Sequence, residues 1–343
     1  MRESLKGVKI YRVPSVRGLG LQSNTNRMGP NPAAARLAAA GFSGVDLNAY
    51  PDNEATALRQ ALAQLHGLDA RSFLVANGSN ETFDLMFKTF LNPGQRAAFP
   101  DPSFAMYPYY AKINAVSYVE VALDEAFELD AAALLATQAQ LYVLCSPNNP
   151  TGNALDPRAI EAVLASGTVT IVDEAYAEFS GYNWLQRIEE FPNLLVTRTL
   201  SKAYGLAGLR VGYVAGHPEL IEQISKARLP YNLNALSQHV ATEALSQQRF
   251  VKDYVAMVVE QRALWGRDLE QRGFLVWPSQ ANFVLARVPQ GVERDSFVAA
   301  LGAAGVVIRS AGDHPRLRDC VRITLGTPQD RQTFLHAVDA VLA

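Results

Sequence analysis

Apolar residues recur along the chain with two alternating spacings, and each spacing predicts a different type of element. The segment 79–91 has the helical spacing, because Phe83, Met86 and Phe90 fall on one face and an Asn-Pro-Gly sequence follows. Short apolar segments without polar alternation are typical of strands buried on both faces of a mostly parallel sheet. Such segments lie at residues 72–77, 97–99, 117–121, 141–145, 169–176, 194–199 and 211–216.

The pattern changes near residue 230, and the change predicts a second domain. Two long helical segments follow, and short strands then alternate with helices to the end of the chain. The N-terminal residues are irregular and rich in Gly, Pro and Asn. We therefore expect an α/β protein in three parts. These are an arm over 1–32 that packs on the small domain or a partner subunit, a large domain over 33–230 and a small domain over 231–343.

Composition narrows the class of protein without identifying a chemistry. Of the 343 residues, 49% are hydrophobic, and the formal net charge is −2, which fits a globular protein that binds neither nucleic acid nor a membrane surface. No apolar run has the length of a signal core or a membrane span. Cys145 and Cys320 lie far apart and the five histidines are scattered, so we expect reduced thiols, no metal site and a cytoplasmic location.

Polar motifs follow several of the expected strands, at the edge of a parallel sheet where ligands collect. The first is Ala-Asn-Gly-Ser-Asn-Glu at 76–81. Gly78 frees the turn, and the amides of Ser79 and Asn80 would then lie at a helix N-terminus, which favours a phosphate. An ordinary helix cap fits the same residues, so this motif alone leaves both interpretations open.

Two further motifs supply other polar groups. In Ser-Pro-Asn-Asn-Pro-Thr-Gly-Asn at 146–153, Asn149 would project from a strand end with an amide that both donates and accepts. Asp173 ends a β-branched run, where a carboxylate needs a cationic or hydrogen-bonded partner. Asp173 is either a helix cap or the partner of a protonated ring nitrogen, and Tyr176 follows closely enough to contact the same ligand.

The last motif, Thr-Leu-Ser-Lys-Ala-Tyr-Gly-Leu-Ala-Gly-Leu-Arg, occupies 199–210. Ser201 and Arg210 offer phosphate ligands, and the small residues around Lys202 allow a flat ligand to approach. A lysine taken alone is more often a solvated surface residue. The four motifs together, however, describe one ligand with a phosphate, a protonated ring nitrogen, a ring oxygen and an aldehyde. That ligand is pyridoxal 5′-phosphate, held by Lys202 as a Schiff base with Asp173 on its ring nitrogen.

Three segments, at 145–153, 172–179 and 198–213, match those of one known family in order and spacing. On these residues the chain resembles the fold-type I aminotransferases that depend on pyridoxal phosphate, and it is most similar to the histidinol-phosphate aminotransferases. The resemblance covers almost the whole chain. It implies a large domain with a mostly parallel sheet in an α/β/α sandwich and a smaller C-terminal α/β domain. It also implies a homodimer that exchanges the amino group of histidinol phosphate with 2-oxoglutarate.

The resemblance also assigns residues that no local pattern identifies. Phe104 would stack on the cofactor ring, where relatives often have tyrosine. Tyr50 would cross a dimer interface to the partner's cofactor phosphate. Arg322 would bind the carboxylate of the amino donor, and Arg309 would join it on a substrate phosphate. The remaining residues expected to line the substrate pocket are Tyr11, Tyr231 and Asn232.

One segment departs from the family pattern. Relatives usually carry Asn-Glu-Asn-Pro near the N-terminus, whereas this chain has Asn24, Thr25, Asn26 and Arg27. The changed charge leaves the amino donor open, and an aromatic-amino-acid aminotransferase or a threonine-phosphate decarboxylase remains an alternative on the same framework. A non-catalytic sensor of the cofactor is disfavoured, because the chain has no basic patch and no spare length for a DNA-binding domain.

Overall fold

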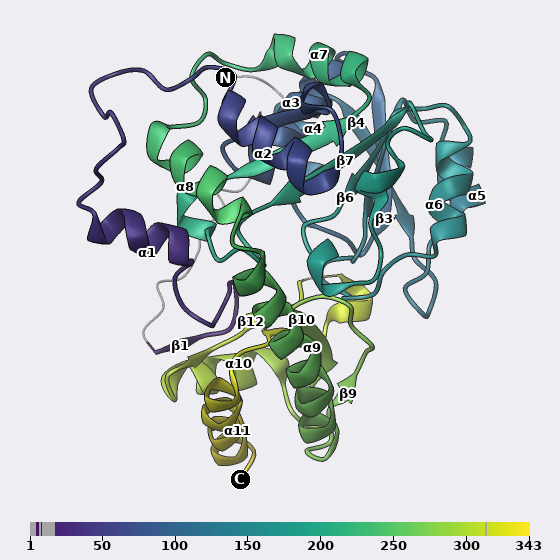
Figure 1. Ribbon diagram of the computed structural model, residues 1–343. Coiled ribbons are helices and arrows are strands. Elements are labelled where there is room, and N and C mark those ends of the chain that lie inside the picture. Colours follow the sequence, from purple (N-terminus) through teal and green to yellow (C-terminus); the bar gives the residue numbers. More distant parts are fainter. Residues whose placement is uncertain (1–4, 7, 9–17, 313) are drawn as a thin grey trace.

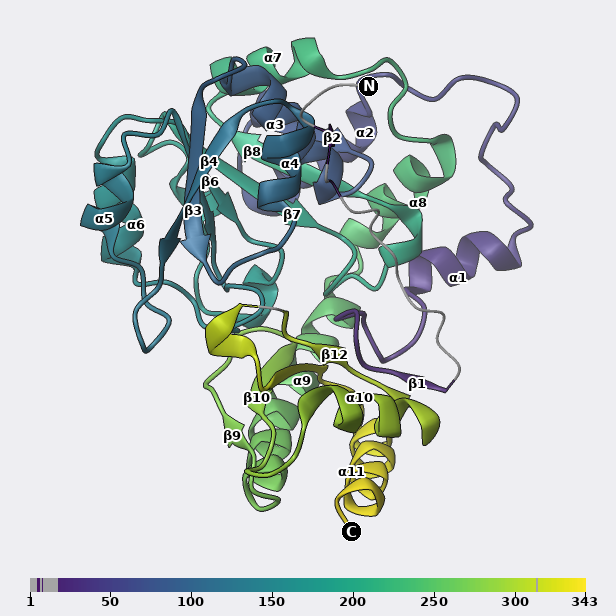
Figure 2. The ribbon, with the colours of Figure 1, turned by 180° about the vertical axis from the view of Figure 1, so that it is seen from behind.

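The computed structural model describes residues 5, 6, 8, 18–312 and 314–343. In these residues the chain forms a large body around one broad sheet and a smaller body around a second sheet (Figure 1). The view from behind shows that the same two bodies meet along the ends of the large sheet (Figure 2). The long helix α9 (Gln248–Glu270) leads the chain from the large body into the small one.

Seven strands of the described chain form the large sheet, in the order β2-β8-β7-β6-β5-β3-β4. Strand β8 is antiparallel to both of its neighbours, and all the other neighbours pair in parallel. The expected mostly parallel sheet is therefore confirmed. Its strands are β2 (Phe73–Ala76), β3 (Arg96–Asp101), β4 (Ser117–Ala122), β5 (Leu141–Cys145), β6 (Thr170–Asp173), β7 (Leu194–Thr199) and β8 (Gly212–Gly216).

Helices cover both faces of this sheet, because successive residues of each buried strand point to opposite faces. On β5, for example, Val143 packs with the helices of one face while Tyr142 and Leu144 pack with those of the other. The result is the α/β/α sandwich that the resemblance implied. One face carries α3 (Ser79–Phe90), α4 (Tyr107–Ile113) and α7 (Pro218–Ala227), and the other carries α2 (Thr56–His66), α5 (Ala131–Ala136) and α6 (Pro157–Leu164).

The smaller body is built on an antiparallel sheet with the order β12-β13-β10-β9. Among the described helices, none is both long enough and apolar enough to cross a bilayer. The elements of this body are α9, β9 (Leu275–Val276), β10 (Phe283–Arg287), α10 (Arg294–Ala303), β11 (Val306–Val307), β12 (Arg309–Ser310), β13 (Cys320–Thr324) and α11 (Pro328–Leu342).

The N-terminal arm lies against the smaller body before the chain enters the large one. Its strand β1 (Leu19–Gly20) pairs in parallel with β11, and the Thr324 amide donates to the Leu21 carbonyl. Helix α1 (Pro32–Ala39) then packs against α8 (Ala235–Leu245), which also packs against α2. Because α8 contacts helices of the large body, the expected domain boundary near residue 230 stays a prediction.

Candidate active site

A cavity of about 280 Å³ lies where the ends of the large sheet meet the smaller body. Eleven of the residues expected from the sequence line it, and they come from elements far apart in the chain. They are Ser79, Asn80, Phe104, Asn149, Asp173, Tyr176, Ser201, Lys202, Arg210, Arg309 and Arg322. The N-terminal arm closes the cavity with Ser23, Asn24 and Thr25.

Asp173 is the last residue of β6 and is only 4% exposed. Its carboxylate accepts one hydrogen bond from the Tyr107 hydroxyl at 2.8 Å and another from the Ala175 amide at 3.1 Å. Burial raises the pKa of Asp173 to about 6, and the bond from Tyr107 partly opposes this rise. Above that pH the site therefore has a buried carboxylate with room for a cationic partner on its cavity side.

Lys202 follows the end of β7, and it is the lysine that lines the cavity. Nζ donates to the Ser23 carbonyl at 2.8 Å and lies 5.7 Å from the centre of the Tyr176 ring. Burial lowers the pKa of Lys202 to about 7, and the positive charges of Arg322 and Arg210 lower it further. A substantial fraction of the amine is therefore neutral near physiological pH, as a nucleophile or a general base requires.

The N-terminus of α3 and Arg210 form an anion-binding corner. Gly78 precedes the helix with φ = 82°, and a Cβ atom there would lie 2.3 Å from Nη2 of Arg210. A Cβ atom on Gly212 would likewise lie 2.3 Å from the Ser79 nitrogen. Gly78 thus leaves space for the Arg210 guanidinium, and Gly212 leaves space for the first residue of α3. The guanidinium and the helix N-terminus together favour a phosphate.

Two arginines form part of the cavity wall. Arg309 and Arg322 face each other across the β12–β13 pair. Arg322 is buried and donates to Oδ1 of Asn149 at 2.6 Å and to the Gln22 carbonyl at 2.7 Å, whereas Arg309 is exposed. Both arginines also line an adjoining cavity of about 150 Å³. This wall can hold an anionic substrate beside the amine.

Among the described residues, three expected ones, Tyr50, Tyr231 and Asn232, do not line the cavity of their own chain. Tyr50 is 81% exposed and stacks on Tyr231 with ring centres 4.6 Å apart. Tyr50 lines a separate surface groove of about 530 Å³ beside α8. Asn232 belongs to a polar network, where its amide donates to Glu81 at 2.9 Å. Tyr11 lies outside the described residues.

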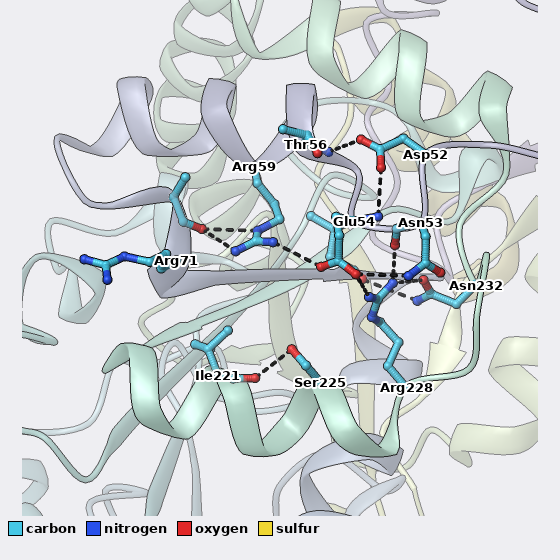
Figure 3. A network of polar contacts seen from close by, with 12 residues as sticks. Asp52, Asn53, Glu54, Thr56, Arg59, Arg71, Ile221, Ser225, Arg228 and Asn232 are labelled. Carbon is cyan, nitrogen blue, oxygen red and sulfur yellow. Dashed lines mark hydrogen bonds and ion pairs between the residues drawn. The ribbon is translucent and has the colours of Figure 1, made fainter.

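Figure 3 shows that network around Arg228, whose guanidinium contacts the Asn53 carbonyl, Glu54 and Asn232. The Asn53 side chain also accepts from the Tyr231 amide at 2.8 Å, so the network fixes the segment that carries both expected substrate residues. It holds them against the chain next to Tyr50 and away from the cavity. Their part in substrate binding stays a prediction.

Sequence reasoning missed several groups that hold the site residues. Tyr107 supports Asp173, the Ser23 carbonyl holds the amine of Lys202, and Asn24 donates to the Tyr176 hydroxyl at 2.9 Å. Only one of these had a signal in the sequence, since a buried carboxylate at Asp173 demands a donor. The others depend on contacts between segments more than 150 residues apart.

The chain is similar to known proteins over most of its length. The family model described as aminotransferase class I and II matches residues 16–338. The histidinol-phosphate aminotransferase of Thermobifida fusca is 38% identical, over 98% of this chain and 94% of its own. That of Parabacteroides distasonis is 38% identical, over 85% of this chain and 86% of its own. The crystal structure of the Sinorhizobium meliloti histidinol-phosphate aminotransferase in complex with pyridoxal-5′-phosphate has a TM-score of 0.89 at 25% identity, covering 100% of this chain and 97% of that one.

Proposed function

The chain belongs to the class I and II aminotransferase family, and from this premise we propose that it exchanges the amino group of histidinol phosphate with 2-oxoglutarate. The products are imidazole-acetol phosphate and glutamate, and the reaction is reversible. As a member of this family the chain is a transaminase that depends on pyridoxal 5′-phosphate. The names of its full-length relatives support histidinol phosphate as the amino donor and histidine biosynthesis as the pathway.

The residues of the cavity fit this cofactor. A lysine amine, a buried carboxylate and an anion-binding corner lie on one cavity, and these are the groups that an aldehyde, a ring nitrogen and a phosphate require. The two glycines of the corner support the same assignment, because any side chain at Gly78 or Gly212 would fill the space that the guanidinium and the helix amides occupy.

Each side chain has a separate task in the proposed reaction. When bound, pyridoxal 5′-phosphate supplies a ring that withdraws the negative charge developing at the substrate α-carbon. Asp173 keeps the ring nitrogen protonated, and Ser79, Ser201 and Arg210 hold the phosphate. The Nζ atom of Lys202 takes the proton from the α-carbon and delivers it on the other side of the transferred nitrogen, acting first as base and then as acid.

The choice of histidinol phosphate as the substrate depends on Arg309 and Arg322. These two arginines face each other across adjacent strands, and both line a second cavity that adjoins the first. Arg322 and Arg309 together suit a phosphate of charge near −2, or the carboxylate of glutamate in the second half of the reaction. An aromatic substrate would need one anionic contact only. The pair therefore favours a phosphorylated amino donor.

We also propose a cytoplasmic homodimer in which Tyr50 completes the phosphate site of the partner subunit. Tyr50 is the most exposed of the large hydrophobic side chains in the described part of the chain, although its ring stacks on Tyr231. Such an exposed aromatic pair is typical of a surface that another chain covers. Mixing two inactive variants, Tyr50→Ala and Lys202→Ala, should restore part of the activity, because each mixed dimer has one intact site. No recovery after verified subunit exchange would contradict the role of Tyr50.

A half-reaction screen tests the substrate. The cofactor-loaded protein is mixed separately with histidinol phosphate, glutamate, phenylalanine and threonine phosphate, and the visible absorbance of the bound cofactor is followed. We expect rapid loss with histidinol phosphate and glutamate, and no loss with any donor in Lys202→Ala. Faster loss with phenylalanine would identify an aromatic aminotransferase. Carbon dioxide release from threonine phosphate without 2-oxoglutarate would identify a decarboxylase.

A further inference from the structure

Asn24 lies at the junction of the arm, the large body and the small body. It is 1% exposed and has φ = 53°, a left-handed conformation that asparagine tolerates better than most residues. Its backbone amide donates to Oγ1 of Thr324 at 2.9 Å, and its carbonyl accepts from Asn282 at 3.0 Å. Its side-chain amide contacts Thr324 at one end and Tyr176 at the other.

The contacts at Thr324 favour one of the two orientations of the Asn24 side-chain amide. A backbone N–H can only donate, so Oγ1 of Thr324 accepts from the Asn24 backbone. The hydroxyl proton of Thr324 is then available for Oδ1 of Asn24, 3.1 Å away. This orientation gives the Thr324 hydroxyl proton an acceptor, and it places the NH₂ group at the other end of the amide, where it donates to the Tyr176 oxygen at 2.9 Å.

This arrangement determines where the proton of Tyr176 can go. Since the phenol oxygen accepts from Asn24, its own proton must point away from Asn24, and Tyr176 is one of the residues that line the cavity. The ring is held in place by an edge-to-face contact with Phe283, at a centre distance of 5.1 Å. Burial raises the pKa of Tyr176 to about 12, so the hydroxyl keeps this proton at neutral pH.

We propose that Asn24 is a positioning residue that directs the hydroxyl proton of Tyr176 toward the ring oxygen of the bound cofactor. Asn24 thereby makes Tyr176 a hydrogen-bond donor to the oxygen that becomes negatively charged. The inference rests on the proposed function only in that pyridoxal 5′-phosphate binds beside Tyr176. It concerns a residue of the arm that the cofactor itself need not touch.

The proposal predicts a spectroscopic effect. At high pH the ring oxygen of a bound cofactor would carry a full negative charge, and the visible absorbance would report the pH at which this form appears. A hydrogen bond donated by Tyr176 stabilises that form. Loss of this hydrogen bond should therefore raise the pKa that is read from the visible absorbance of the bound cofactor, called the absorbance pKa below. The loss of one hydrogen bond to a charged oxygen corresponds to a rise of about one to two pH units.

Two substitutions of Asn24 distinguish an effect of the orientation of the Tyr176 hydroxyl proton from an effect of added negative charge. Asn24→Asp removes the NH₂ donor and accepts the Tyr176 proton instead, so the absorbance pKa should rise by the full amount. Asn24→Gly removes the side chain without adding charge and tolerates the left-handed backbone, so the rise should be smaller. Asn26→Asp is the matched control, because Asn26 lies in the same segment and contacts the Ala203 carbonyl. It adds the same charge without a contact to Tyr176.

The decisive comparison uses Tyr176→Phe. If Asn24 acts through the phenol, Asn24→Gly raises the absorbance pKa in the wild-type background and has no further effect in Tyr176→Phe. The charged and titratable groups that face Tyr176, namely Arg322, Asp173, Cys145 and Lys202, are unchanged in all four proteins. Dissociation of the cofactor from each variant, measured by dialysis, is a second readout. Thermal unfolding of the cofactor-free proteins confirms that each is folded.

The outcomes are distinct. An Asn24→Gly protein with the wild-type absorbance pKa would overturn the inference, as would an Asn24→Gly effect that persists in Tyr176→Phe. A rise in Asn26→Asp as large as in Asn24→Asp would assign the effect to charge and also overturn it. A wild-type protein that binds no cofactor would instead contradict the proposed function.

Discussion

Replacing Lys202 by methionine should stabilise the cofactor-free protein near neutral pH. Lys202 is partly buried on the cavity beside Arg322 and Arg210, and loss of hydration is the largest cause that lowers its pKa from 10.5 to about 7. In the unfolded chain the same amine is solvated and has its ordinary pKa. Methionine has nearly the same shape, carries no charge and removes this cost from the folded state.

The magnitude follows from the pKa values. A fall from 10.5 to about 7 corresponds to at most about 5 kcal/mol of unfolding free energy. Methionine leaves the Ser23 carbonyl without its donor, which costs about 1 kcal/mol, and Lys202 is only partly buried, which lowers the cost of its charge. We therefore expect Lys202→Met to be more stable than the wild type by about 2 to 4 kcal/mol at pH 7.

The pH dependence gives the sharper test. Between pH 7 and pH 10.5 the unfolded wild-type chain binds a proton at Lys202 that the folded protein lacks, so wild-type stability rises with pH. The contribution of Lys202 to this rise is up to about 1.4 kcal/mol per pH unit, and the Lys202→Met protein lacks it. The difference in unfolding free energy between Lys202→Met and the wild type should thus be constant below pH 7 and should decrease as the pH approaches 10.5.

Urea denaturation of the cofactor-free proteins at several pH values measures the difference. Lys252→Met, on the exposed face of α9, is the matched control for the loss of a positive charge. Wild-type and Lys202→Met curves that stay parallel from pH 7 to pH 10 would contradict a lowered pKa at Lys202, whatever their separation. A Lys202→Met protein that is less stable at pH 7 would refute the assigned cost of burial.

Three further predictions concern the surroundings of the cavity. Glu174→Gln should lower the unfolding free energy in urea by about 3 kcal/mol, because it leaves the buried guanidinium of Arg198, 2.6 Å away, without its counterion. Arg27 and Asp330 contact at 2.9 Å and are both partly buried, so a double-mutant cycle of their alanine variants should give a coupling of about 1 kcal/mol, and zero coupling would contradict this. Gly78→Ala should weaken cofactor binding at least about tenfold in a fluorescence titration with little change in circular dichroism, since the new methyl group would occupy guanidinium space.

The residues that converge on the cavity could be predicted from the sequence because most of them directly follow a strand. Asp173 ends β6, Lys202 follows β7 and Asn149 follows β5, and these three strands are adjacent and parallel. Parallel pairing brings their C-terminal ends to one edge of the sheet, so the local motifs needed no knowledge of distant contacts. The buried strands and the two layers of helices follow from the same apolar pattern.

The arm could not be predicted in this way. Residues 22–24 have no periodic pattern, and each contributes a carbonyl or amide to a group far away in sequence, including Arg322, Lys202 and Thr324. Such a segment is irregular because its hydrogen bonds go to side chains and to other strands instead of to its own turn. Its composition, rich in asparagine, is consistent with that use, but nothing in the sequence indicates the partners.

The end of β6 shows why the chemistry and the stability of this protein are linked. Asp173 and Glu174 are consecutive carboxylates at a strand end, and both are buried. Asp173 lines the cavity, where a cationic group of a ligand can pair with its carboxylate. Glu174, by contrast, forms an ion pair with Arg198 and accepts a hydrogen bond from the Trp184 amide. Glu174 thus has partners in the folded chain, while the full stabilisation of Asp173 depends on the cofactor. The cofactor should therefore stabilise the fold as well as supply the chemistry, because among the described residues Asp173 has only the more distant charge of Lys202 and no ion pair of its own.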